Sequence, residues 1–129
     1  MARTVPDPSV HVFLGGTLAD LVTIEAMLAT MPLCTYGQVV IESDDEIAPL
    51  NLPRRVQVRR VGVRRSITGD AITGEAVARA ADAWLGEWMP GEHETRSSLF
   101  AWIGCEGSIA AADAADRLDH SLRAGLAGS

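Results

Sequence analysis

Apolar runs without polar alternation constrain the fold more than any other feature of this chain. Such runs are typical of strands buried on both faces of a parallel sheet; here they lie at 11–15, 39–41 and 99–103. Other stretches repeat their apolar residues at steps of three and four, as amphipathic helices do; these are 18–31, 72–88 and the residues from about 108 onward.

A fourth strand is predicted at 56–63, where the alternation of apolar residues changes phase at Arg59 and Arg60. A bulge or an edge position explains such a change. The order of elements predicts an α/β fold: a single three-layer domain with a mostly parallel sheet of four or five strands and helices on both faces. We expect one domain over 1–129 with an ordered core of about 10–126, and a first helix that opens at about Thr17.

Charge and cysteine content exclude several function classes. The formal charge of −6 argues against general nucleic-acid binding, because the phosphate backbone favours basic surfaces. No apolar run approaches the roughly 18 residues that a membrane span needs, so we expect a cytoplasmic protein without membrane contact. Cys34 and Cys105 are far apart in sequence, which predicts neither a disulfide framework nor a metal site.

Candidate ligand contacts follow the strands, because ligands of such sheets bind beyond the carboxyl ends of the strands. Gly15 and Gly16 end the first strand and allow a phosphate to approach the backbone, while Thr17 caps the next helix and leaves amides facing the anion. The three-glycine dinucleotide fingerprint is incomplete. A tight strand-to-helix turn is therefore the alternative interpretation.

Two further candidates are a carboxylate and a pair of arginines. Glu42 follows the second strand, where nucleotide-binding folds often place an acceptor for the ribose; the alternative is a solvated acidic loop. Six of the eleven arginines fall within 54–65, and Arg64 and Arg65 lie past the strand, where they could clamp a phosphate. Protection of a sheet edge by charge is the alternative.

The last strand runs into Cys105 and Glu106. A helix amino terminus favours the thiolate of a cysteine, and Glu106 is either a helix-start carboxylate or a ligand contact. No histidine adjoins Cys105 to act as its base, and a small buried cysteine is the alternative. No catalytic residue is assigned.

The segment Trp102-Ile103-Gly104-Cys105-Glu106 resembles the Trp-x-Ala-Gly-Glu signature of the carboxyl-terminal domain of siderophore-interacting proteins, which are relatives of the ferredoxin reductases. Gly16 and the helix after it are similar to that family's first turn, and 39–42 resembles its second strand. The resemblance covers nearly the whole chain. It implies a Rossmann-like domain that binds NADPH or NADH, for which the candidate contacts are Gly15, Gly16, Thr17, Glu42, Cys105 and Glu106. By their position after a strand, Arg64 and Arg65 are the candidates for contact with a 2′-phosphate.

In that family the domain works beside a flavin held on a separate barrel, and the pair reduces ferric siderophores. This chain lacks the barrel's Arg-x-Tyr-Ser/Thr motif, so we expect it to bind no flavin alone and not to be a complete reductase. Its first turn reads Gly16-Thr17-Leu18-Ala19 where the family has Gly-Asp-Glu-Thr.

Three hypotheses follow. The chain is a NAD(P)H-binding or accessory partner of a flavin-dependent ferric-siderophore reductase, with a flavoprotein as partner. Alternatively, it is a non-catalytic interaction module that self-associates, for example as a homodimer, and has lost the nucleotide site. The third is an independent enzyme that uses Cys105.

Overall fold

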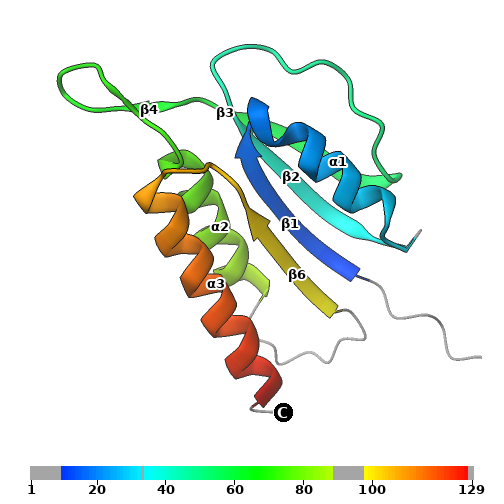
Figure 1. Ribbon diagram of the computed structural model, residues 1–129. Helices are drawn as coiled ribbons and strands as arrows, with labels where there is room; N and C mark the ends of the chain where they lie inside the picture. The colour runs from blue at the N-terminus through cyan, green and yellow to red at the C-terminus, as the bar shows by residue number, and fades with distance from the viewer. Residues whose placement is uncertain (1–9, 33, 89–97, 128–129) are drawn as a thin grey trace, which may run out of the picture.

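The computed structural model describes residues 10–32, 34–88 and 98–127. It is an α/β fold built on a four-stranded sheet in the order β3-β2-β1-β6, with every neighbouring pair parallel (Figure 1). The strands are β1 (Val10–Thr17), β2 (Tyr36–Glu42), β3 (Arg55–Val61) and β6 (Ser98–Ile103). The predicted fold class is confirmed.

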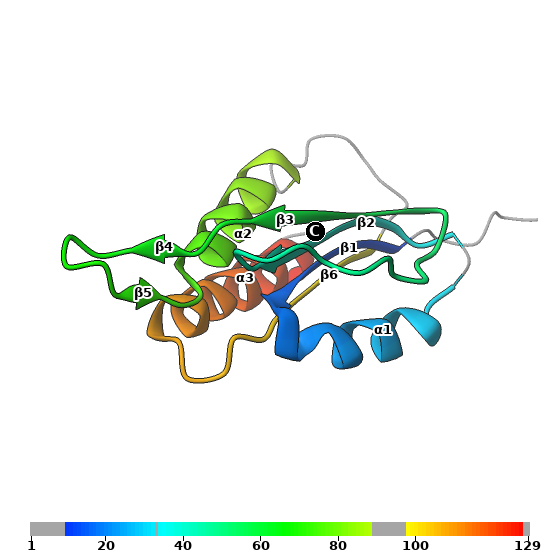
Figure 2. The same cartoon turned by 90° about the horizontal axis from the view of Figure 1, so that it is seen from above.

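Helices cover both faces of the sheet (Figures 1 and 2). One face carries the short 3-10 helix η1 (Leu18–Asp20) and α1 (Leu21–Ala29), and the other carries α2 (Glu75–Trp88) and α3 (Ile109–Ala127). Because side chains alternate across a strand, each strand supplies both cores. In β1, Phe13 packs with Trp84 of α2, whereas Leu14 packs with Ile24 of α1.

Of the two explanations for the fourth strand, a bulge or an edge position, the structure favours the edge, since β3 ends the sheet in the described part of the chain. Only Val56 of this strand is fully buried, which accounts for the irregular apolar pattern. The sequence did not predict the antiparallel hairpin of β4 (Arg64–Arg65) and β5 (Ala71–Ile72), whose short strands carry no periodic signal. In Figure 1 this hairpin projects from the body of the molecule.

The first helix differs in detail from the prediction. Thr17 is the last residue of β1, and regular α-helix begins only at Leu21, after the tighter turn of η1. No helix in the described part of the chain combines the length and the apolar character needed to cross a membrane.

Candidate functional site

The carboxyl edge of the sheet brings together most of the predicted site. β1 ends at Thr17, β2 at Glu42 and β6 at Ile103, and the N-termini of η1, α2 and α3 meet the same edge (Figure 1). Six of the predicted residues therefore lie near one another: Gly15, Gly16, Thr17, Glu42, Cys105 and Glu106. Arg64 and Arg65 lie apart from them, in the projecting hairpin.

The side chain of Asp20 lies at the centre of this edge. Its Oδ2 accepts the backbone N–H of Thr17 at 2.8 Å and that of Cys105 at 2.9 Å, and it also accepts the Thr17 hydroxyl at 3.2 Å. The first of these amides belongs to the last residue of β1, where a phosphate was predicted to bind, and the second to the turn after β6. A carboxylate of the chain itself takes both donors.

Glycines make room for that carboxylate. A Cβ added to Gly16 would lie 2.5 Å from Asp20 Oδ2, and one added to Gly104 would lie 2.5 Å from Asp20 Oδ1. Gly15 allows the side chain of Val77 in α2 to pack close to β1, because a Cβ added to Gly15 would lie 2.5 Å from a methyl carbon of Val77. The glycines of both turns thus allow contacts within the chain.

Glu42 is bound to the start of α2. Its side chain is buried at 3% exposure, and its two carboxylate oxygens accept the N–H of Gly74 at 3.0 and 2.9 Å. Oε1 also lies 3.4 Å from the N–H of Val77. The N-terminal amides of a helix have no partners inside the helix, and a carboxylate placed there also stabilises its dipole. Glu42 therefore caps α2, with both oxygens turned toward the helix.

Cys105 lies in the turn after β6 with a φ of 57° and only 3% exposure. α3 begins at Ile109, so the thiol does not lie in the first turn of that helix. Burial, followed by the negative charges of Glu42 and Asp20, raises the pKa of Cys105 to about 12. Of the two interpretations of Cys105, the structure favours the small buried cysteine, because desolvation and two nearby carboxylates disfavour its thiolate. Glu106 beside it is exposed.

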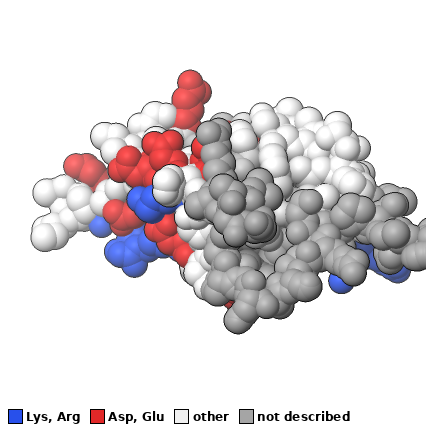
Figure 3. Space-filling model, turned by 90° about the horizontal axis from the view of Figure 1, so that it is seen from below, with Lys and Arg blue, Asp and Glu red and all other residues white. Residues whose placement is uncertain are grey.

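Arg64 and Arg65 are both engaged in ion pairs. Arg64 binds Glu75 at the start of α2, and Arg65 Nη2 lies 2.8 Å from Asp44 Oδ2. The N–H of Val63 and the guanidinium of Arg65 lower the pKa of Asp44. These contacts tie the hairpin to α2 and to the loop after β2. Figure 3 likewise shows acidic and basic side chains next to one another at one end of the molecule.

These residues do not fit a dinucleotide in this conformation. A pyrophosphate needs free amides at the glycine-rich turn, and here Asp20 holds the Thr17 and Cys105 amides and would repel a phosphate. A ribose needs a carboxylate that it can reach, and Glu42 is only 3% exposed, with both of its oxygens turned to the Gly74 amide. Within the described ranges, no group of three acidic, histidine or cysteine residues is placed to hold a metal ion.

Sequence reasoning missed Asp20, although a signal was present. Thr17 and Asp20 have the spacing of a capping box, in which a residue three positions on accepts the N–H of the capping residue. It also missed a group of polar side chains at the opposite end of the strands. The signal there was polar residues at the start of otherwise apolar strands, such as His11 and Gln38.

Comparison with solved structures places the fold. A siderophore utilization protein from T. fusca superposes with a TM-score of 0.55 at 16% identity, over 88% of this chain and 38% of that chain. The likeness is one of fold. The siderophore-interacting protein SipS from Aeromonas hydrophila gives a TM-score of 0.48 at 21% identity, over 85% of this chain and 40% of its own. This chain thus spans about two fifths of the length of either protein. No protein-family model and no curated protein matches the sequence.

Proposed function

We propose that this chain is a non-catalytic accessory domain in siderophore utilisation, which binds another protein and holds no dinucleotide of its own. The fold that this chain shares with a siderophore utilization protein supports a role in siderophore utilisation. The carboxyl edge supports the loss of the nucleotide site. A flavoprotein that reduces ferric siderophores is the partner that the resemblance implies.

One observation carries the proposal. Asp20 Oδ2 accepts the amides of both Thr17, the last residue of β1, and Cys105, in the turn after β6. A charge-assisted hydrogen bond to a backbone N–H is about twice as strong as a neutral one, so a phosphate would have to displace a better-placed anion of the chain. An incoming dinucleotide would meet negative charge where it needs donors.

A second candidate is a domain that binds NADPH or NADH for a flavoprotein partner. What favours it is that Gly15, Gly16, Thr17, Cys105 and Glu106 share one edge of a parallel sheet, where such folds bind ligands. It requires that the side chain of Asp20 move aside when ligand binds. The two candidates predict opposite results in one experiment.

The experiment is thermal unfolding of the wild-type protein with NADPH, NADH, pyrophosphate or no ligand. Ligand at about 100 times its dissociation constant adds roughly 2.7 kcal/mol, which shifts the midpoint of a domain of this size by several degrees. We expect no shift for the wild type. A concentration-dependent shift with either dinucleotide would overturn the proposal and favour the second candidate.

A variant tests whether Asp20 is the cause. Asp20→Ala frees the Thr17 and Cys105 amides and removes one negative charge, so pyrophosphate should now raise the midpoint. Asp20→Asn keeps the side chain and removes only the charge, and serves if the alanine variant does not fold. Asp116→Ala is the matched control, because it removes one charge from an exposed position of α3. A shift in the control as large as in Asp20→Ala would assign the effect to net charge.

A further inference from the structure

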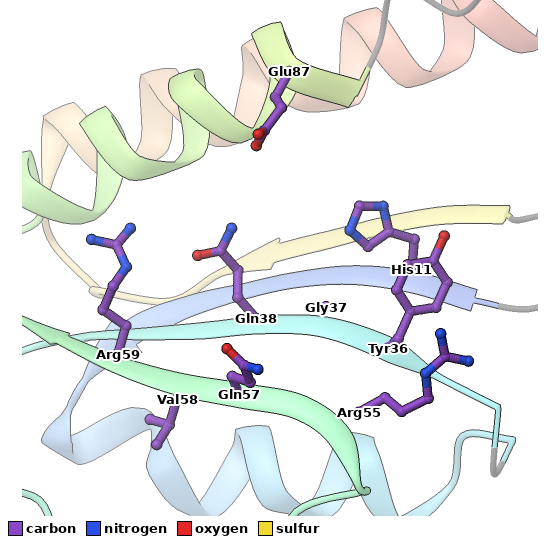
Figure 4. A pocket seen from close by; sticks show the side chains of 9 residues that line it. All are labelled: His11, Tyr36, Gly37, Gln38, Arg55, Gln57, Val58, Arg59 and Glu87. Atoms are coloured by element: carbon purple, nitrogen blue, oxygen red, sulfur yellow. The ribbon is translucent and has the colours of Figure 1, made fainter. Parts of the chain in front are cut away.

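A polar groove of about 510 Å³ lies at the opposite end of the strands from the carboxyl edge. Its floor is the α2-facing side of β1, β2 and β3, and Glu87 of α2 points into it from above (Figure 4). Helix α2 packs against β1 and β2, which leaves the groove-facing residues of β3 exposed: Arg55, Gln57 and Arg59. These three side chains share one face because residues two apart on a strand point the same way.

A stack of three side chains forms one end of the groove. The His11 and Tyr36 rings are parallel within 4° with centroids 4.5 Å apart, and Arg55 lies 5.3 Å from the centroid of the Tyr36 ring. Trp84 Nε1 lies 3.4 Å from His11 Nε2 and links the stack to the core. Tyrosine and arginine held in this way lose little conformational freedom when a partner binds, which is why they dominate binding at interfaces.

Two arginines of this groove, Arg55 and Arg59, have no ion-pair partner in the described part of the chain. Arg64, Arg65 and Arg117 form ion pairs with acidic side chains. Arg55 and Arg59 form none with any residue in the described ranges, although the chain carries a net charge of −6. The groove is therefore a local basic site on an acidic protein, with Glu87 as the one acidic side chain in its lining.

The outer edge of β3 adjoins the groove. β3 is the last strand in the sheet order, so no described strand pairs with this edge. Val58, whose side chain points away from the groove in Figure 4, is 41% exposed. An unpaired edge offers backbone donors and acceptors to an extended chain, and such strand addition is a common mode of peptide recognition.

We infer that the β3 edge and its groove bind an extended acidic segment of a partner protein. Arg55 and Arg59 lie four residues apart, or about 13 Å along a strand, which matches acidic residues at the same interval in a paired extended segment. Small-molecule sites enclose most of their ligand, whereas one side of this groove is formed by exposed residues of the edge strand β3. A peptide chain is therefore the better occupant.

A second copy of this chain is a poorer occupant of the same edge. Two copies paired through β3 about a two-fold axis would place arginine next to arginine, and like charges in adjacent strands are destabilising. The inference rests on the proposed role as a protein-binding domain. The two can fail separately, because the dinucleotide experiment probes the carboxyl edge and the following one probes the β3 groove.

The test uses a fluorescently labelled short peptide of alternating Glu and Val, read by anisotropy. Alternation places Glu beside Arg55 and Arg59 and Val beside Val58. We expect saturable binding that weakens when ionic strength rises from about 0.05 to about 0.5 M. A control peptide with the same residues in block order should bind far less tightly, because its glutamates lose the register with the arginines. The alternating peptide N-methylated on its β3-facing amides should also bind far less tightly, because it loses the hydrogen bonds to β3.

Matched variants locate the site. Arg59→Glu should weaken binding by about tenfold or more, since it turns an attractive pair into a repulsive one. Arg79→Glu makes the same charge change at an exposed position of α2 outside the groove lining, and should leave affinity unchanged. Glu87→Gln removes the competing carboxylate and should strengthen binding. Melting curves establish that each variant is folded.

Several results would overturn the inference. One is the absence of saturable binding by the alternating peptide, which would leave the arginines as protection of the edge against aggregation. Another is an equal loss in Arg59→Glu and Arg79→Glu, which would indicate unspecific attraction. Sedimentation showing a wild-type dimer whose dissociation constant changes in Arg59→Glu but not in Arg79→Glu would assign the edge to a second copy instead.

Discussion

Removing the Glu42 carboxylate should destabilise the protein even though no ligand is involved. In Glu42→Ala the Gly74 amide loses both of its acceptors and the Val77 amide loses its contact, all inside the protein. Loss of a helix cap costs about 0.5–2 kcal/mol, and a buried unsatisfied donor costs about 1–3 kcal/mol. Because these contributions overlap, we expect a loss of about 2–4 kcal/mol in the free energy of unfolding. Glu42→Gln keeps an acceptor and loses the charge, so about 1–2 kcal/mol is expected.

The measurement is urea unfolding followed by circular dichroism. Glu46→Ala is the control, because Glu46 is an exposed carboxylate in the loop after the same strand. A carboxylate whose role is to bind a ribose would contribute almost nothing to the stability of the ligand-free protein. If Glu42→Ala unfolds at the same urea concentration as Glu46→Ala, the assignment of Glu42 as the α2 cap is wrong.

Three further predictions concern single residues. Because the pKa of Cys105 is raised to about 12, its thiol should resist alkylation in the folded protein at neutral pH, with half-buried Cys34 labelled first in mass spectrometry. Gly37→Ala should lower the free energy of unfolding by several kcal/mol, since the φ of Gly37 is 138° and the new Cβ would lie 2.1 Å from a carbonyl oxygen of β1. Gly86→Ala, in open space on α2, should instead raise it by about 1 kcal/mol. Urea unfolding of both variants tests this, and equal midpoints would refute it. Burial lowers the pKa of His11 below 6.5, so its contribution to stability is present above that pH and is lost as pH falls through the lower folded value; His11→Gln should remove that part of the pH dependence.

The sequence predicted the sheet because its strands carry the strongest pattern. Apolar runs such as 39–41 are typical of strands in a sheet covered on both faces. Val40 and Ile41 are fully buried on opposite faces of the sheet. The hairpin at 64–72 was missed because its strands are two residues each and are held mainly by polar contacts and ion pairs. Such contacts leave no periodicity in a sequence.

The candidate site was predicted in its location but not in its chemistry. Gly16 and Glu42 were expected just after their strands and lie among the last residues of β1 and β2 instead, so topology alone still places them at one edge. What each side chain bonds depends on neighbours distant in sequence, such as Cys105 for Asp20 and Gly74 for Glu42. A glycine that admits a phosphate and a glycine that admits an aspartate look the same in sequence.

The most direct test of the account follows the two amides that Asp20 holds. In a ¹H–¹⁵N correlation spectrum of the wild-type protein, the Thr17 and Cys105 resonances report on the hydrogen bonds to Asp20 Oδ2. The account predicts that both resonances stay in place as NADPH is added, and that both move in Asp20→Ala titrated with pyrophosphate. Saturable movement of both resonances in the wild type with NADPH would contradict it, because the amides would then be available to a nucleotide.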